Sequence, residues 1–104
     1  MNRRKTVRYC LQLPVIFTWR DSKGTKRKEG GFTRDIGTGG LYVVSSTRPS
    51  VGTALRLDIL LPLAGNATSP IARLRATASV ARMGDSNEEY GFAACGDLGF
   101  VAPI

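Results

Sequence analysis

Apolar side chains recur at every second residue along much of this chain, and this period constrains the fold more than any other feature. It is clearest in residues 11–19, 55–59 and 72–80, where apolar and polar positions alternate. A period of two is typical of β-strands that bury one face. Shorter apolar runs bounded by turn residues predict three more strands, at 29–36, 41–45 and 90–94.

Six short strands with turn signals between them and no helical period predict an all-β fold, either an antiparallel barrel or a sandwich. A length of 104 residues suffices for one domain, 1–104, with one modest core. Arg73 and Arg75 occupy polar positions of a strand, and we expect them to face solvent. We expect the large aromatic residues to lie in the core: Phe17, Trp19, Tyr90 and Phe92.

The residue types of the chain exclude most catalytic sites. There is no histidine, which removes Ser-His-Asp and Cys-His catalysis and the common histidine-containing metal sites. Cys10 and Cys95 match no metal-binding spacing, and we expect reduced thiols in the core or at an edge. The acids Asp85, Glu88 and Glu89 crowd one turn, where we expect water to solvate them. We therefore expect no enzyme activity and no cofactor.

No apolar run approaches the length needed to span a membrane. The basic residues 1–5, followed by the apolar positions of 11–19, weakly imitate a signal peptide. Arg8, Gln12 and Pro14 interrupt this pattern, and no small-residue cleavage site follows it. We expect a cytoplasmic protein.

Positive charge is concentrated in the first third of the chain. Residues 1–34 carry ten lysines and arginines against two acids, whereas residues 35–104 carry five against six. Such a cluster attracts an anion, for example a nucleotide, a nucleic acid or a membrane surface. Alternatively the cations only aid solubility, which fits residues 23–28 best. Residues 1–9 show no amphipathic period, and we expect them to form a flexible basic arm.

A glycine-rich segment at 35–40 joins two of the predicted strands. Gly37, Gly39 and Gly40 fall within four residues, which permits positive φ and a close approach of a ligand to the backbone. Asp35 opens the segment, and its carboxylate can accept hydrogen bonds either from its own turn or from a ligand. The alternative is a tight β-turn without a binding role.

Two motifs together resemble the PilZ domain, a bacterial receptor for cyclic di-GMP. One is Arg4-x-x-x-Arg8, preceded by Arg3, and the other is the segment 35–40, which resembles the family motif (Asp/Asn)-x-Ser-x-x-Gly. Their order and the strands predicted downstream, including Val80-Ala81-Arg82 and Tyr90-Gly91-Phe92, are also similar to the family. The resemblance covers roughly the whole chain by pattern and implies a six-stranded antiparallel split barrel that binds cyclic di-GMP.

The resemblance also implies roles for individual residues. Arg4 and Arg8 would clamp the ligand, Asp35 would accept hydrogen bonds from a guanine, and Gly40 would form the turn. Arg3 resembles the residue before the clamp in members that bind the ligand as a stacked dimer. The implied ligand-binding residues are Arg3, Arg4, Arg8, Asp35, Gly37, Thr38, Gly39 and Gly40.

These residue types suit cyclic di-GMP, which presents two phosphates and two guanines. A guanidinium can bond a phosphate or a guanine through two parallel hydrogen bonds and can stack on a base. A carboxylate accepts from the N1–H and the exocyclic amine of guanine. Gly37 stands where the family has serine, and the missing hydroxyl contact costs about 1 kcal/mol, or several-fold in affinity. Thr38, one residue on, carries the nearest substitute hydroxyl.

Three functions are compatible with the sequence. The first is a regulatory module without catalysis that binds cyclic di-GMP and passes the signal to a downstream protein partner. The second is a degenerate PilZ-like interaction domain that binds the ligand weakly or not at all. The third is a small basic β-barrel that binds nucleic acid; exposed aromatic residues for base stacking are not evident, so we do not expect nucleic acid as the partner.

Overall fold

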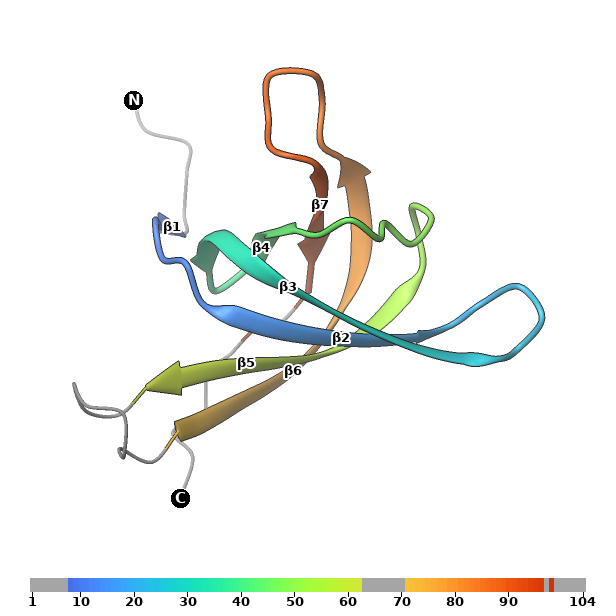
Figure 1. Ribbon diagram of the computed structural model, residues 1–104, viewed down its shortest axis with the longest axis horizontal. Coiled ribbons are helices and arrows are strands. Elements are labelled where there is room, and N and C mark those ends of the chain that lie inside the picture. Colours follow the sequence, from blue (N-terminus) through green and yellow to red (C-terminus); the bar gives the residue numbers. More distant parts are fainter. Residues whose placement is uncertain (1–7, 63–70, 97, 99–104) are drawn as a thin grey trace.

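The computed structural model describes residues 8–62, 71–96 and 98, and in this part of the chain it contains strands and turns but no helix (Figure 1). Accordingly, no helix that could cross a membrane is found in these residues. The seven strands are β1 (Arg8–Tyr9), β2 (Pro14–Arg20), β3 (Lys26–Gly37), β4 (Gly40–Val44), β5 (Ala54–Pro62), β6 (Ile71–Met83) and β7 (Gly91–Cys95).

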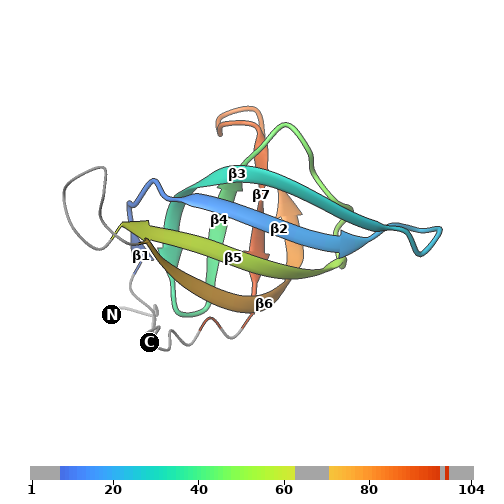
Figure 2. The same cartoon turned by 60° about the horizontal axis from the view of Figure 1, so that its bottom comes forward.

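Six of these strands form a closed antiparallel barrel. The hydrogen-bonded order is β3-β2-β5-β6-β7-β4, and β4 pairs again with β3, which closes the sheet on itself. Figure 2 shows β2 and β5 in one wall of the barrel and β4 and β7 in the wall behind. The all-β prediction and all six predicted strands are confirmed. The pairing of β3 with β4 decides for a barrel and against a sandwich, because a sandwich leaves sheet edges open.

The long strand β3 serves two neighbours in succession. Its first part pairs with β2 from Lys26 to Phe32, and its second part pairs with β4 as far as Ile36. The short strand β1 adds to the end of β3, with Arg8 opposite Gly37. Two residues of the predicted arm 1–9 thus belong to the sheet, while residues 1–7 lie outside the described part of the chain.

The inward positions of the strands form one apolar core. Phe17 lies at its centre, edge-to-face against Phe92 at 5.2 Å between ring centroids and stacked with Trp19 at 5.4 Å. Phe17 and Phe92 are fully buried, as predicted, and Trp19 packs partly buried against the core. The prediction for Tyr90 is wrong: it is 57% exposed, because it precedes β7 in a turn, where Arg48 packs on its ring.

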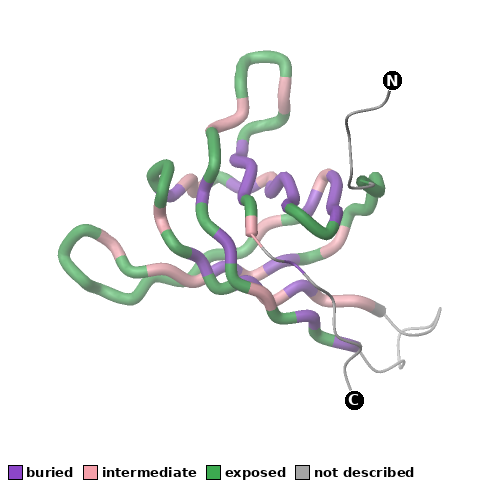
Figure 3. Tube along the Cα trace, turned by 180° about the vertical axis from the view of Figure 1, so that it is seen from behind, coloured by how far each residue is buried: buried purple, intermediate pink, exposed green. Residues whose placement is uncertain are grey.

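Several positions outside the core also test the sequence predictions. Arg73 and Arg75 are exposed, as expected. Cys10 and Cys95 are both free thiols, but both are exposed and neither belongs to the core. The lysine-rich residues 26–28 lie in β3. The tip of the β2–β3 hairpin, residues 22–25, is exposed (Figure 3). Residues 63–70, between β5 and β6, and most of the residues after β7 lie outside the described part of the chain.

Candidate functional site

Arg8, from the first motif, meets the glycine-rich segment on the outer face of the barrel, where β1, β3 and β4 adjoin. Ile36 of β3 and Leu41 of β4 are paired and point into the core. Because side chains alternate between the two faces of a strand, Asp35, Gly37 and Gly40 belong to the outer face. The closed barrel therefore gathers residues that the sequence distributes over two strands and a turn.

Small residues continue this outer face onto β7. In the register of β4 and β7, Gly40 lies opposite Cys95 and Tyr42 lies opposite Ala93. Residues directly opposite each other in an antiparallel pair share one face of the sheet. Gly37, Gly40, Ala93 and Cys95 therefore form a low floor, which we call the small-residue floor. This floor lies beside Asp35.

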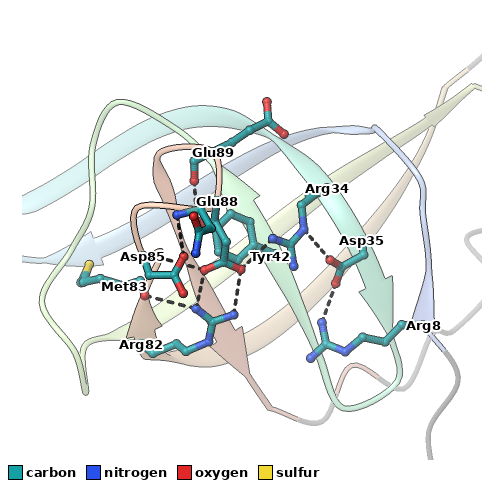
Figure 4. Close-up of polar contacts among 10 residues, drawn as sticks. Arg8, Arg34, Asp35, Tyr42, Arg82, Met83, Asp85, Glu88 and Glu89 are labelled. Carbon is teal, nitrogen blue, oxygen red and sulfur yellow. Dashed lines mark hydrogen bonds and ion pairs between the residues drawn. The ribbon is translucent and has the colours of Figure 1, made fainter.

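Arg8 lies directly at this floor. Its partner in β3 is Gly37, and Asp35 is two residues away on the same face, the diagonal position that a long side chain reaches. Arg8 Nη1 donates a hydrogen bond to Asp35 Oδ1 at 2.5 Å (Figure 4). Arg8 Nη2 also lies 3.5 Å from the point where a Cβ on Gly40 would stand. The structure thus brings Arg8, Asp35 and Gly40 together.

Among the glycines of the turn, Gly40 acts through close approach. The described glycines with positive φ are Gly24 and Gly52, so positive φ, which the sequence made plausible for 37–40, is not used there. A Cβ on Gly40 would lie 2.6 Å from the carbonyl oxygen of Ala94, closer than real Cβ atoms approach a backbone atom. Gly40 therefore lets β4 pack tightly against β7.

Thr38 and Gly39 lie exposed at the tip of the turn. Their carbonyls accept hydrogen bonds from the backbone N–H groups of Leu98 and Gly96, at 3.0 and 3.2 Å. The residues that follow β7 thus hold the turn from one side. Arg3 and Arg4, the remaining predicted site residues, lie outside the described part of the chain.

Arg34 was not identified from the sequence, and it is a second partner of Asp35. The register of β3 and β4 shifts between Thr33, opposite Val43, and Asp35, opposite Tyr42, so Arg34 is the extra residue of a β-bulge. Its Nε donates to Asp35 Oδ2 at 2.7 Å. With both oxygens bonded to arginines, the carboxylate accepts no hydrogen bond from a described backbone N–H, which disfavours the Asx-turn alternative.

Arg34 also reaches the turn between β6 and β7. Its Nη1 donates to Glu88 Oε2 at 2.7 Å. Arg82 binds the same carboxylate through two hydrogen bonds, of 2.7 and 3.0 Å. Only 15% of the Glu88 side chain is exposed, so the expectation of a solvated turn acid is wrong for this residue. Arg82 stands six residues before Glu88, so the sequence alone places it near this turn. The sequence carries no signal for the contact of Arg34 with Glu88.

Tyr42 is fully buried although it points away from the core. The Arg34 guanidinium lies over its ring at 4.1 Å from the centroid, within range of a cation–π contact. The Tyr42 hydroxyl donates to the backbone carbonyl of Glu89 at 2.5 Å. Tyr42 therefore forms a rigid support between the barrel and the β6–β7 turn.

The charges of the site hold each acid ionised. Burial would raise the pKa of Asp35, but hydrogen bonds and charges from Arg34 and Arg8 outweigh burial and lower it. Hydrogen bonds from Arg82 and then Arg34 hold the pKa of Glu88 far below its usual range. The hydrogen bond to Glu88 raises the pKa of Arg34 against the opposing effect of burial. At neutral pH the site is therefore an alternating array of full charges.

Comparison with known proteins adds a structural neighbour. No protein-family model matches the chain, and no curated protein sequence matches it. The solved structure of the Bacillus subtilis inhibitor of motility, MotI/DgrA, is similar with a TM-score of 0.64 and 19% sequence identity. The match covers 100% of this chain and 45% of that chain. At this identity the similarity concerns the fold, and the chain spans less than half of its neighbour.

Proposed function

We propose that this protein is a regulatory module that binds cyclic di-GMP and has no catalytic activity of its own. The observation that carries the proposal is the contact of Arg8 with Asp35 above Gly40, because it joins one residue from each of the two motifs that resemble the PilZ domain. The proposed ligand residues are those predicted from the sequence: Arg3, Arg4, Arg8, Asp35, Gly37, Thr38, Gly39 and Gly40.

The geometry supports a division of roles between Arg8 and Asp35. In the free protein the two side chains neutralise each other, with 35% of Arg8 and 11% of Asp35 exposed. A ligand that carries both phosphate and guanine offers each of the two side chains a new partner. Arg8 turns to the phosphate or to guanine O6 and N7, and guanine N–H groups donate hydrogen bonds to Asp35. Arg4 and Arg3, from the segment before β1, are proposed to complete the clamp.

The small-residue floor supports a flat ligand. Gly37, Gly40 and Ala93 leave the sheet without bulk beside Arg8, so a base can approach the backbone. The neighbour MotI/DgrA is by its name an inhibitor of motility, which agrees with a regulatory role.

Calorimetric titration with cyclic di-GMP tests the proposal directly. We expect binding to the wild type and a loss of about tenfold or more for Arg8→Ala, since hydrogen bonds to charged groups contribute about 1.5–3 kcal/mol. Arg4→Ala should behave in the same way. Arg56→Ala is the matched control, because it removes an exposed cation on β5, across the barrel. Equal binding by all four proteins would exclude the clamp.

Cys95 offers an independent test of where the ligand binds. Its thiol is exposed and lies opposite Gly40 on the small-residue floor. In a Cys10→Ser variant it is the one remaining cysteine, and we expect cyclic di-GMP to slow its alkylation by iodoacetamide. An unchanged alkylation rate at saturating ligand would mean that the ligand binds elsewhere.

A second candidate function is binding of duplex nucleic acid. It is favoured by basic side chains on β2, β3 and β5. In the strand register, Lys26 of β3 lies opposite Arg20 of β2, and Lys28 lies opposite Thr18. On its other side, Thr18 lies opposite Arg56 of β5. These four cations are exposed on one outer face, and none forms a salt bridge with an acid of the described residues. Such a surface attracts phosphates without reading sequence.

Salt dependence distinguishes this candidate from the first. Four phosphate contacts give a slope of log K against log salt of about −3 to −4. If the surface binds duplex DNA, Lys28→Ala should reduce the slope by about one, and Arg8→Ala should leave it unchanged. A shallow slope for the wild type would contradict binding of nucleic acid at this surface and would favour a solubilising role for the four cations.

A further inference from the structure

Five alternating charges connect the candidate ligand site with the turn between β6 and β7. They are Arg8, Asp35, Arg34, Glu88 and Arg82, which we call the charge network (Figure 4). Arg8 and Asp35 belong to the proposed site, whereas Glu88 belongs to the turn and Arg82 to the adjoining strand β6. Arg34 is the member that joins the two halves.

Arg34 hydrogen bonds both acids of the network with different nitrogens. Nε is bonded to Asp35 and Nη1 to Glu88, each at 2.7 Å. Its location in the β-bulge of β3 explains this reach, because a bulge redirects the side chain of the extra residue. Among the described residues, no other side chain bonds both acids.

The β6–β7 turn, residues 84–90, depends on the same contacts. Glu88 Oε1 accepts the backbone N–H of Asp85 at 3.1 Å, which closes the turn on its own side chain. Tyr42 bonds the carbonyl of Glu89, and Gly84 lies so close that a Cβ there would be 1.8 Å from the Tyr42 hydroxyl. Glu88 and Tyr42 therefore contribute to the conformation of the turn, and Arg34 contacts both.

We infer that Arg34 is a positioning residue that couples the Arg8–Asp35 contact to the conformation of the β6–β7 turn. When Arg8 leaves Asp35, the carboxylate loses one of its two cations and attracts Arg34 more strongly. The Arg34 guanidinium then shifts toward Asp35 and weakens its bond to Glu88. Arg34 also lines a hollow of about 300 Å³, together with Phe32, Val44 and Glu89 among others.

The inference extends the proposed function, on which its physiological meaning rests, because cyclic di-GMP would be the agent that displaces Arg8. The ligand replaces the Arg8 cation by neutral guanine donors, so Asp35 retains its greater attraction for Arg34. The turn would then loosen when the site is occupied. An exposed turn that responds to ligand is a surface from which a partner protein can read the signal.

The coupling is testable without any ligand by hydrogen exchange of the turn amides. Arg8→Ala imitates the departure of Arg8, and we expect residues 84–90 to exchange about two to five times faster than in the wild type, the factor of one partly exposed ion pair. In an Arg34→Met background the same substitution should change the turn no further. Amides of 55–59 in β5 serve as the internal control, since a general loss of stability would accelerate them as well.

Two results would overturn the inference. One is equal exchange of 84–90 in the wild type and in Arg8→Ala. The other is an effect of Arg8→Ala that persists in the Arg34→Met background. If Arg34→Met does not fold, Glu88→Gln interrupts the network at its next contact and must abolish the effect instead.

Titration with cyclic di-GMP then separates the inference from the proposed function. We expect ligand to accelerate exchange of 84–90 in the wild type, whereas Arg34→Met binds the ligand without this response. Binding without a response in the wild type contradicts the coupling and leaves the receptor function intact. If Arg8→Ala accelerates exchange of the turn but no protein binds cyclic di-GMP, the receptor function is contradicted and the coupling stands.

Discussion

Gly37→Ser is the substitution that tests most directly whether the site is a working receptor. The PilZ motif that the segment 35–40 resembles has serine at this position, and the substitution distinguishes a working receptor from a degenerate interaction domain. Gly37 ends β3 opposite Arg8, on the outer face that also carries Asp35. A serine there would direct its hydroxyl onto the small-residue floor beside the Arg8 guanidinium.

The expected gain can be worked from this geometry. One added hydroxyl makes one hydrogen bond to the ligand phosphate region, which contributes about 1 kcal/mol net, or about fivefold in affinity. The gain in binding free energy stays below the largest values for hydrogen bonds to charged acceptors. Ordering of the serine side chain and desolvation of its hydroxyl both oppose it. Gly37 is buried, so part of the effect of any substitution comes from the added Cβ alone.

Calorimetry with Gly37→Ser and Gly37→Ala separates these two contributions. The alanine variant adds the Cβ without a hydroxyl, so the difference in Kd between the two variants isolates the hydrogen bond. We expect serine to bind cyclic di-GMP about fivefold more tightly than alanine, at one fixed salt concentration. Equal affinities would refute the position of the phosphate beside residue 37. Absence of binding in the wild type and both variants would favour the degenerate domain.

Three further predictions concern stability. Gly40→Ala should lower the free energy of unfolding by about 1–3 kcal/mol in urea denaturation, because its Cβ would lie 2.6 Å from the carbonyl of Ala94; a neutral result would contradict the close approach. Tyr42→Phe should cost about 1 kcal/mol in the same assay, through loss of one buried hydrogen bond, and an unchanged midpoint would mean that water replaces it. Asp35 and Glu88 have lowered pKa values in the folded state, so their stabilisation is complete above the ordinary carboxyl pKa of about 4 and is lost as the pH falls below it. Urea midpoints from pH 7 to pH 3 should therefore fall less steeply for Glu88→Gln than for the wild type.

The fold class was largely predictable because strand periodicity is a local property. The alternation in 11–19, 55–59 and 72–80 requires only that one face of each strand be buried, and all the strands so predicted occur. The error at Tyr90 has the same origin. An aromatic residue next to a strand has the right composition for the core, but its exposure depends on whether the strand has already begun.

The candidate site was predictable only in part. Arg8, Asp35 and Gly40 stand in short motifs, and a motif indicates residue types that act together even when it cannot give their distances. Arg34 stands beside Asp35 in the sequence and appears there as one more cation of a basic segment. Its role depends on a bulge, on the strand register and on a turn that lies more than fifty residues away.

The sequence by itself determined an all-β chain with a basic first third, a glycine-rich turn and no histidine. The tertiary structure alone decided that the strands close into a barrel, that Arg8 meets Asp35 across the β1–β3 pairing, and that Arg34 joins that contact to Glu88. The physical reason is that burial patterns are set by neighbouring residues, whereas pairing of charges depends on register and closure, to which every strand of the barrel contributes.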